Sequence, residues 1–91
     1  MRLEWDETKR QSNLVKHRLD FVDVAELFQQ PYVRLQDTRK DYRETRWVAY
    51  GIIRQRVCVC VYTERSGAIR TISLRKGNSR EQAFYQENLA D

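Results

Sequence analysis

The chain has 91 residues and a mass of 11.0 kDa, so we expect one small domain over residues 1–91 with a modest hydrophobic core. Hydrophobic residues make up 41% and charged residues 33%, which excludes a disordered or collagen-like chain. No apolar run is long enough to span a membrane, and the first residues lack the apolar centre of a signal peptide. These features predict a cytoplasmic protein.

The basic residues are concentrated in the middle of the chain. Residues 32–80 contain 12 basic and 4 acidic side chains, a net charge of +8, whereas residues 1–31 carry −1 and residues 81–91 carry −3. Thirteen of the 17 basic residues are arginine, whose planar guanidinium group binds phosphate through two parallel hydrogen bonds. This distribution favours a polyanion as the partner, although a solvated charged surface has the same composition.

The first third of the chain predicts a short strand and two helices. Leu3 to Trp5 form a candidate edge strand, and Asp6 is a candidate N-cap for a polar helix over about residues 7–17. A second helix begins at Asp20, because apolar residues recur after it with helical spacing, and Pro31 ends it.

The middle of the chain predicts an antiparallel sheet. Strand-favouring residues fill four segments, namely residues 32–35, 46–53, 57–63 and 68–75. Hairpin turns are expected at residues 54–56 and 64–67, and Gly51 is expected to mark a bulge or twist. The run from Val57 to Val61 is apolar at every position, so we place it at the centre of the sheet, covered on both faces.

A last helix is expected to begin at Asn78, which forms a capping box with Glu81, and to run to about Leu89. Cys58 and Cys60 alternate with valines along one strand, which predicts buried, reduced thiols and no zinc site. The expected fold is therefore α+β, with two N-terminal helices, an antiparallel sheet of three or four strands and a C-terminal helix.

His17 is the only histidine, so a site with several histidine ligands is excluded. One interpretation makes it a proton donor or acceptor, because imidazole exchanges protons near neutral pH. The other makes it a structural residue, because a positive charge is favoured near the C-terminus of a helix. The chain has no metal-binding or nucleotide-binding motif, so we expect neither a metal nor a cofactor.

The segment from Ala68 to Lys76 offers several groups that bind phosphate, namely Arg70, Ser73, Arg75 and Lys76. Strict alternation places Ser73 and Arg75 on one face of the strand and Arg70 on the other, unless the strand twists locally. Glu64 and Arg65, at the preceding turn, are candidates for a base and a further phosphate ligand. Ion pairing across a solvated sheet face is the alternative explanation.

Aromatic side chains lie near these charges in the sequence. We assign Trp47, Tyr50 and Phe84 to the core. Tyr85, beside Phe84 on an amphipathic helix, is the better candidate for a solvent-facing or active-site hydroxyl.

Taken together, the chain resembles the BrnT family of toxins from bacterial type II toxin–antitoxin pairs. The resemblance covers nearly the whole chain in order, through Glu4–Glu7, Lys9, Asn13–Leu14, Lys16–His17, Asp20–Phe21, Ala25, Phe28, Asp37–Arg39, Asp41–Tyr42, Glu44, Arg46–Gly51, Val61–Arg65, Ile69–Arg70, Ile72–Lys76 and Arg80–Glu81. The family usually has alanine where Gly77 stands, and this difference does not affect the expected function.

The resemblance implies a RelE-like fold and an endoribonuclease that needs no metal or cofactor and that blocks translation by cleaving RNA. It also implies a BrnA-like antitoxin as partner, in a heterotetramer of two toxins and two antitoxins. Operator DNA would be bound only through that complex, and no membrane is involved.

The resemblance also supports specific site residues. The expected catalytic residues are His17, Glu64, Arg70, Arg75 and Lys76. His17 or Glu64 would act as acid or base, and the three cationic residues would stabilise the charge of the phosphorane. The expected RNA contacts are Lys9, Lys16, Arg65, Ser73 and Tyr85.

Two other functions fit the sequence. The protein would be a nucleic-acid-binding module without catalytic activity if the arginine-rich middle only holds phosphates. It would be a corepressor if this toxin-like chain has lost activity and only assists operator binding.

Overall fold

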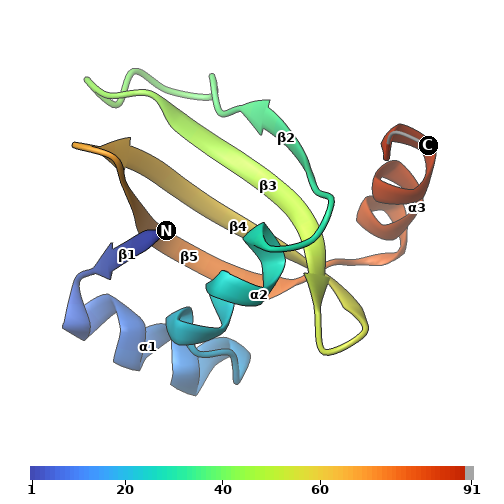
Figure 1. The fold of residues 1–91 in the computed structure, drawn as a ribbon, viewed down its shortest axis with the longest axis horizontal. Helices are drawn as coiled ribbons and strands as arrows, with labels where there is room; N and C mark the ends of the chain where they lie inside the picture. Colours follow the sequence, from blue (N-terminus) through green and yellow to red (C-terminus); the bar gives the residue numbers. More distant parts are fainter. Residues whose placement is uncertain (90–91) are drawn as a thin grey trace.

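The computed structural model describes residues 1–89 as three α-helices around one five-stranded sheet (Figure 1). The strands lie in the order β1-β5-β4-β3-β2, and β1 is parallel to β5 while the other neighbours are antiparallel. The strands are β1 (Arg2–Trp5), β2 (Val33–Gln36), β3 (Arg46–Ile53), β4 (Arg56–Arg65) and β5 (Ala68–Lys76). The helices are α1 (Glu7–His17), a 3₁₀ turn η1 (Phe21–Asp23), α2 (Val24–Phe28) and α3 (Ser79–Asn88).

The α+β class is confirmed, but the expected antiparallel sheet of three or four strands is wrong in detail. The sheet has five strands and is mixed, because β1 pairs in parallel with β5, with Leu3 opposite Ile69. A four-residue strand shows no preference for a partner 60 or more positions away, so the sequence indicated the strand without its pairing.

The N-terminal helices begin at the predicted caps. The Asp6 carboxylate accepts hydrogen bonds from the backbone N–H groups of Thr8 and Lys9, at 2.8 and 3.2 Å. Asp20 caps a short 3₁₀ turn in the same way, through the N–H of Val22 at 3.0 Å. The second helix is shorter than expected, because α2 proper has only five residues.

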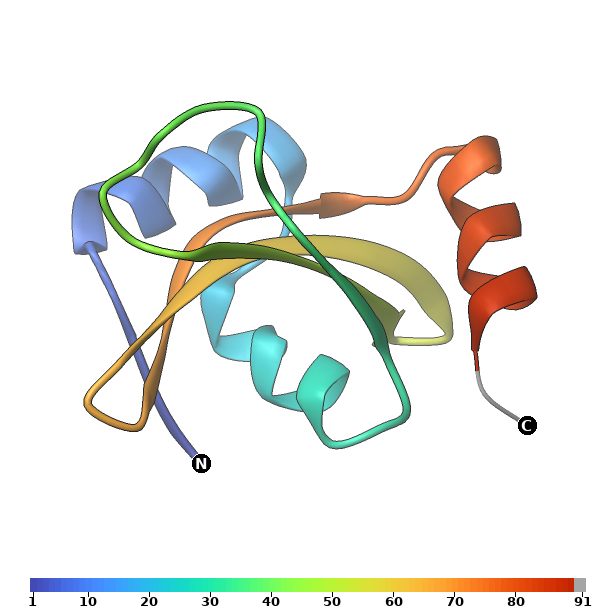
Figure 2. The same cartoon turned by 90° about the horizontal axis from the view of Figure 1, so that it is seen from above.

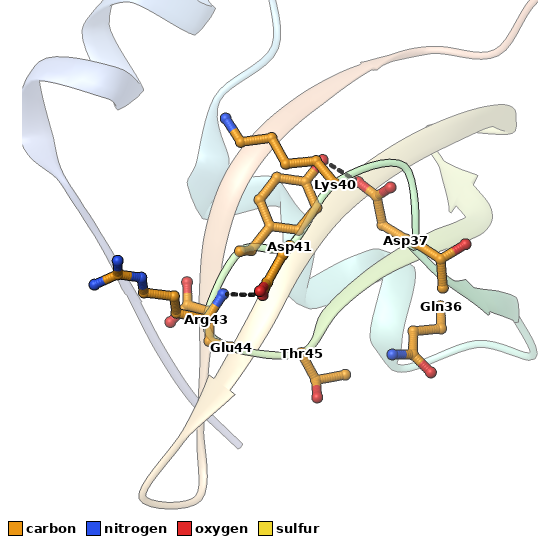
Figure 3. Close-up of a pocket in the computed structure, with 9 residues that line it drawn as sticks. Gln36, Asp37, Lys40, Asp41, Arg43, Glu44 and Thr45 are labelled. Atoms are coloured by element: carbon orange, nitrogen blue, oxygen red, sulfur yellow. Dashed lines mark hydrogen bonds between the residues drawn. The ribbon is translucent and has the colours of Figure 1, made fainter.

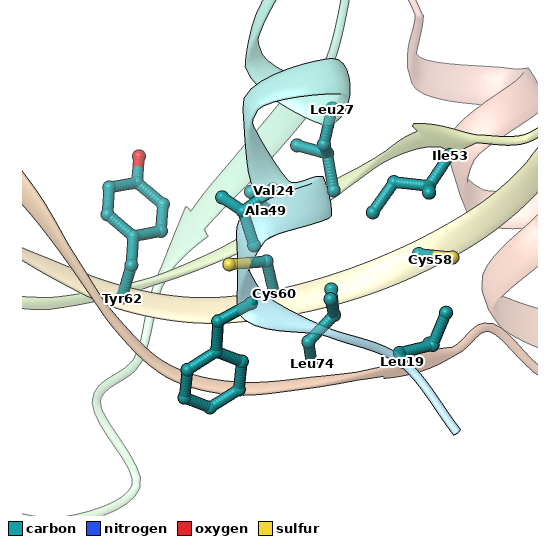
Figure 4. Close-up of a cluster of buried hydrophobic side chains, with 10 residues drawn as sticks. Leu19, Val24, Leu27, Ala49, Ile53, Cys58, Cys60, Tyr62 and Leu74 are labelled. Carbon is teal, nitrogen blue, oxygen red and sulfur yellow. The ribbon is translucent and has the colours of Figure 1, made fainter. Parts of the chain in front are cut away.

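Strand β4 is the centre of the sheet, as its uninterrupted apolar run predicts. Cys58, Cys60 and Tyr62 point from β4 toward η1 and α2, and they pack in one cluster with Leu27 and Leu74 (Figure 4). We call this side of the sheet the helix face. Both cysteines are free and almost fully buried, and burial raises the pKa of each thiol.

The opposite side of the sheet, here called the groove face, is partly covered by α3. Phe84 of α3 packs against Tyr50 of β3 with ring centroids 4.8 Å apart. Both views show α3 at the other side of the molecule from α1 (Figures 1 and 2).

Two tight hairpins connect the three long strands. Arg54 and Gln55 form the first turn with φ of 50° and 67°, and Ser66 and Gly67 form the second with φ of 49° and 81°. Positive φ at both central residues defines a type I′ turn, which matches the twist of the strands. The first turn lacks glycine, and Glu26 accepts the Arg54 N–H at 2.8 Å, which holds this strained backbone in place.

Gly51 does not mark a bulge, contrary to expectation. It pairs regularly with Cys58, and a Cβ at this position would come within 2.8 Å of the Leu27 side chain. The glycine therefore allows α2 to pack closely on the sheet.

The bulge lies in β5 instead. Val61 pairs with Ser73 and Tyr62 pairs with Thr71, so Ile72 is an extra residue on β5. The extra residue shifts the alternation by one position and places Arg70 on the groove face together with Ser73 and Arg75. Strict alternation predicted that Arg70 faces the other way, and this prediction is wrong. The alternative, in which a local irregularity of the strand turns Arg70 to the face of Ser73 and Arg75, agrees with the bulge.

Asn13 on α1 takes the place of a neighbouring strand beyond the end of β1. Its side-chain amide accepts a hydrogen bond from the N–H of Leu74 at 3.0 Å and donates to the carbonyl oxygen of Leu74 at 2.8 Å. The same amide donates to the carbonyl of Leu19 at 3.0 Å. One buried side chain therefore fixes α1 to the edge of β5 and to the segment that follows the helix.

No helix within residues 1–89 is long and apolar enough to cross a membrane.

We predict that Asn13→Ala lowers the free energy of unfolding by about 2–4 kcal/mol, because it leaves buried backbone groups of Leu74 and Leu19 without partners. Denaturant unfolding measures this change. Ser12→Ala, at the exposed neighbouring position on α1, is the matched control and should change stability by less than about 0.5 kcal/mol. Equal effects of the two substitutions would contradict the role of the Asn13 amide.

Candidate functional site

A first hollow lies between α1 and the outer edge of β5. It has a volume of about 260 Å³ and is lined by Lys9, Ser12, Asn13, Lys16, His17, Ile72 and Ser73. The helical positions recur at three- and four-residue spacing, so they share one side of α1. Within residues 1–89, Lys9, Lys16 and His17 form no ion pair. We call this cationic depression the α1 hollow.

A second depression, the sheet groove, lies on the groove face next to the α1 hollow. It has a volume of about 460 Å³, and valines of β3 and β4 line it, namely Val48, Val59 and Val61. Arg39, from the loop after β2, and Arg75, from β5, bring guanidinium groups to it. Ser73 lines both the sheet groove and the α1 hollow, so the two depressions meet at this residue.

Glu81 at the start of α3 holds Arg75 in place. The two terminal nitrogens of Arg75 donate to the two carboxylate oxygens of Glu81, at 2.7 and 2.6 Å. This pair raises the pKa of Arg75 and lowers the pKa of Glu81. Glu81 also accepts the N–H of Asn78 at 2.9 Å, as the predicted capping box requires.

The contact with Glu81 leaves one edge of the Arg75 guanidinium group unused. A guanidinium group has five N–H donors, and those of Nε and the outer side of Nη2 make no hydrogen bond within residues 1–89. These two N–H groups are parallel, so this edge suits a second bidentate partner such as phosphate. The side chain is 43% exposed, so the edge is accessible.

The loop between β2 and β3 forms the other side of the sheet groove and is organised by Asp37. This carboxylate accepts hydrogen bonds from Nε and Nη2 of Arg39, at 2.9 and 2.8 Å, and from the Tyr42 hydroxyl at 3.1 Å (Figure 3). The Asp37 side chain is only 1% exposed. Arg39 is the main cause of a pKa of Asp37 well below its ordinary value.

The structure brings half of the predicted site residues together. Lys9, Lys16, His17 and Ser73 line the α1 hollow, and Ser73 and Arg75 line the sheet groove. Arg70 lies on the same face of β5, beyond the bulge.

Other predicted site residues lie elsewhere. Glu64 and Arg65 are the last residues of β4 rather than part of a turn. Glu64 is on the helix face, 3.5 Å from Arg34, and Arg65 is paired with Glu44 of the β2–β3 loop at 2.9 Å. Lys76 also points to the helix face, because it pairs with Cys58, so it does not face the same side as Arg75.

The expectation of an exposed hydroxyl at Tyr85 is wrong. Tyr85 is 4% exposed, and its hydroxyl donates to the carbonyl of Pro31 at 3.3 Å. Tyr50, which we assigned to the core, instead lines the sheet groove and is only partly buried. Burial raises the pKa of Tyr50, so its hydroxyl stays protonated at neutral pH.

Sequence reasoning missed the contributions of Asn13, Arg39 and Glu81 to this site. The Asp37-Thr38-Arg39 spacing was a detectable signal, because an aspartate and an arginine two residues apart in a polar loop favour a local ion pair. Asn13 and Glu81 had no such signal for their contacts with β5. Glu81 was expected only in the capping box of its own helix, and Asn13 was named only among the residues that carry the family resemblance.

Residues 1–89 contain no cluster of three or more His, Cys, Asp or Glu side chains with the geometry of a metal site.

The fold and the two adjoining depressions define a small α+β protein with a concave cationic surface. The model of the family described as "Ribonuclease toxin, BrnT, of type II toxin-antitoxin system" matches residues 5–81. The match covers most of the chain, so the chain belongs to the BrnT family of ribonuclease toxins from type II toxin–antitoxin systems. None of the curated proteins matches the chain.

We predict that Asp37→Asn lowers the free energy of unfolding at neutral pH by about 1–2 kcal/mol, because Arg39 and Tyr42 lose a buried anionic acceptor. The effect is no larger because the Arg39 side chain is exposed and solvent screens its charge. Since folding lowers the pKa of Asp37 from 3.8, the carboxylate stabilises the wild type fully above that value. This contribution is lost as the pH falls through the lowered pKa.

The measurement is denaturant unfolding from about pH 7 to pH 2. Wild-type stability should fall in the acid part of this range more steeply than that of Asp37→Asn. Asp41→Asn, in the same loop but exposed, is the control and should follow the wild-type curve. Parallel curves for wild type and Asp37→Asn would show that Asp37 does not titrate with folding.

Proposed function

We propose that this protein is a metal-independent endoribonuclease whose catalytic centre lies where the α1 hollow meets the sheet groove. The proposal is supported by the position of Ser73, which lines both the depression that contains His17 and the one that contains Arg75. A backbone phosphate beside Ser73 would have the lysines of α1 on one side and the free guanidinium edge on the other.

RNA supplies its own nucleophile, so the chemistry asked of the protein is limited. The 2′-oxygen forms a bond to phosphorus and loses its proton, while the bond to the 5′-oxygen breaks and that oxygen gains a proton. His17 is suited to one of these two proton transfers, and water exchanges the other proton. Arg75, Lys9 and Lys16 stabilise the extra negative charge of the phosphorane, and Ser73 orients the phosphate.

The proposed centre is smaller than the set of residues expected from the sequence. Glu64 and Lys76 lie on the helix face, so we give them no part in the chemical step. Arg70 lies on the correct face, and we propose that it binds RNA beyond the bulge. His17 is then the acid–base group of the proposal.

Membership of a type II toxin family implies an antitoxin partner. We propose a BrnA-like antitoxin in a complex of two toxins and two antitoxins, a RelE-like arrangement of helices and sheet, and inhibition of translation as the result of RNA cleavage. The complex, rather than the toxin alone, would bind operator DNA and repress transcription.

We predict that the purified protein cleaves single-stranded RNA in the presence of EDTA. Arg75→Ala should lower kcat by about 10²–10³-fold, because the phosphorane loses a charged donor. His17→Gln should lower kcat by about 10²–10⁴-fold and flatten one limb of the pH–rate profile. Single-turnover kinetics at saturating RNA measure both effects.

Arg80→Ala is the matched control, because Arg80 is exposed in the first turn of α3 and lines neither depression. It should cleave like the wild type. Loss of cleavage in EDTA would refute metal independence. If the wild type binds RNA without cleaving it, the non-catalytic binding function replaces the nuclease.

We predict that the toxin alone binds operator DNA weakly and that the co-purified complex with its antitoxin binds it tightly. Light scattering measures the stoichiometry, and a DNA-binding titration compares the two samples. Tight, sequence-specific binding by the toxin alone would contradict the assignment of DNA recognition to the antitoxin.

A further inference from the structure

A third cationic depression lies on the helix face, at the end of β5 and next to the α1 hollow. It has a volume of about 190 Å³ and includes Leu19, Ile53 and Cys58 among its apolar lining. Four basic residues surround it, namely Arg18, Arg54, Arg56 and Lys76. We call it the Arg18 hollow.

Three of these four cations have no acidic partner within residues 1–89. Arg54 is the exception, because its guanidinium group pairs with Asp23 at 2.9 Å. Arg18, Arg56 and Lys76 are exposed and take part in none of the ion pairs of the structure. Two of these charges act on Cys58, which lines the hollow. Arg56 and Lys76 both lower the pKa of its thiol, although burial raises that pKa more strongly.

The backbone explains why three like charges lie together. Arg18 is the C-cap of α1 with φ of 58°, which turns the chain away from the helix directly after His17. Lys76 follows Arg75 on β5, so the two side chains point to opposite faces of the sheet. Arg56 begins β4, immediately after the tight turn.

Two pairs of consecutive residues connect the Arg18 hollow to the proposed catalytic centre. His17 lines the α1 hollow and its neighbour Arg18 lines the new one, while Arg75 lines the sheet groove and its neighbour Lys76 lines the new one. A strand rises about 3.3 Å per residue, so Ser73 and Lys76 are about 10 Å apart along β5. Basic residues of the three depressions therefore follow one another along the end of α1 and the end of β5.

We propose that the Arg18 hollow binds a backbone phosphate of single-stranded RNA, outside the scissile nucleotide, through Arg18, Arg56 and Lys76. The inference rests on the proposed function, because it extends the path of the same substrate. Arginine side chains that are not already neutralised suit phosphate, and the apolar lining gives this hollow no acidic group of its own. The hollow contributes to binding and not to the chemical step.

The test measures the salt dependence of RNA affinity by fluorescence anisotropy. The probe is a short single-stranded 2′-O-methyl RNA, which lacks the nucleophile and stays intact whatever the mechanism is. For single strands, log K falls with log salt by about 0.7 for each phosphate that the protein neutralises. The double variant Arg18→Gln/Arg56→Gln should therefore bind more weakly at low salt and show a slope smaller by about 0.7–1.4.

The matched control is Arg43→Gln/Arg80→Gln, which removes the same net charge from exposed positions outside the Arg18 hollow. Its slope should equal that of the wild type. Thermal melts should be similar for all three proteins. In single-turnover cleavage at saturating RNA, the rate of Arg18→Gln/Arg56→Gln should equal the wild-type rate.

The outcomes separate this proposal from the proposed function. If the wild type binds and cleaves RNA but the hollow variant keeps the full slope, the RNA does not pass through the hollow and the nuclease assignment stands. If the hollow variant and the control lose equal slope, general charge explains binding. A parallel titration uses fluorescent poly-glutamate as the probe. If Arg18→Gln/Arg56→Gln weakens binding of poly-glutamate but not of RNA, the hollow receives an acidic protein segment instead. If the wild type binds no RNA, the proposed function itself fails.

Discussion

The hydrogen bonds between the Asn13 amide and the backbone of Leu74 connect helix α1 to the edge of β5. They occur at the point where β1 has ended and the edge of β5 would otherwise be unpaired. A strand edge left open in a small sheet invites pairing with other chains, and a helix that bonds to it through one side chain closes it. No strand pairs with β5 on this side after Thr71. The space beside Ile72 and Ser73 is therefore open, and it forms the α1 hollow.

The bulge at Ile72 has a comparable effect on the other side of the strand. Without it, Arg70 would point to the helix face while Ser73 and Arg75 faced the groove. A single extra residue therefore gathers three phosphate-binding side chains on one face. Bulges of this kind re-aim side chains at a small cost in pairing, and here the cost is one unpaired residue between β4 and β5.

Much of the fold could be predicted from sequence because the signals are local. Asp6 and Asn78 are good caps with helical sequences after them, and the apolar run of β4 is typical of a central strand. The rest depends on contacts between distant segments. The parallel pairing of β1, the position of the bulge and the burial of Tyr85 under Pro31 follow from packing, so neither alternation nor helix periodicity could indicate them. The same limit applies to the site, where Lys9 and Arg75 have clear chemistry but their neighbourhood is a matter of tertiary structure.

The two arginines of the sheet groove each have a carboxylate partner, whereas Lys9, Lys16 and Arg70 beside it have none within residues 1–89. A chain segment with a net charge of +8 would repel itself if every positive group were concentrated at one place without counter-charge. Asp37 and Glu81 neutralise the two guanidinium groups inside the groove. The fold can therefore hold two guanidinium groups around one cavity without a large repulsion between them. The uncompensated charge is left at the rim, where water and mobile ions screen it.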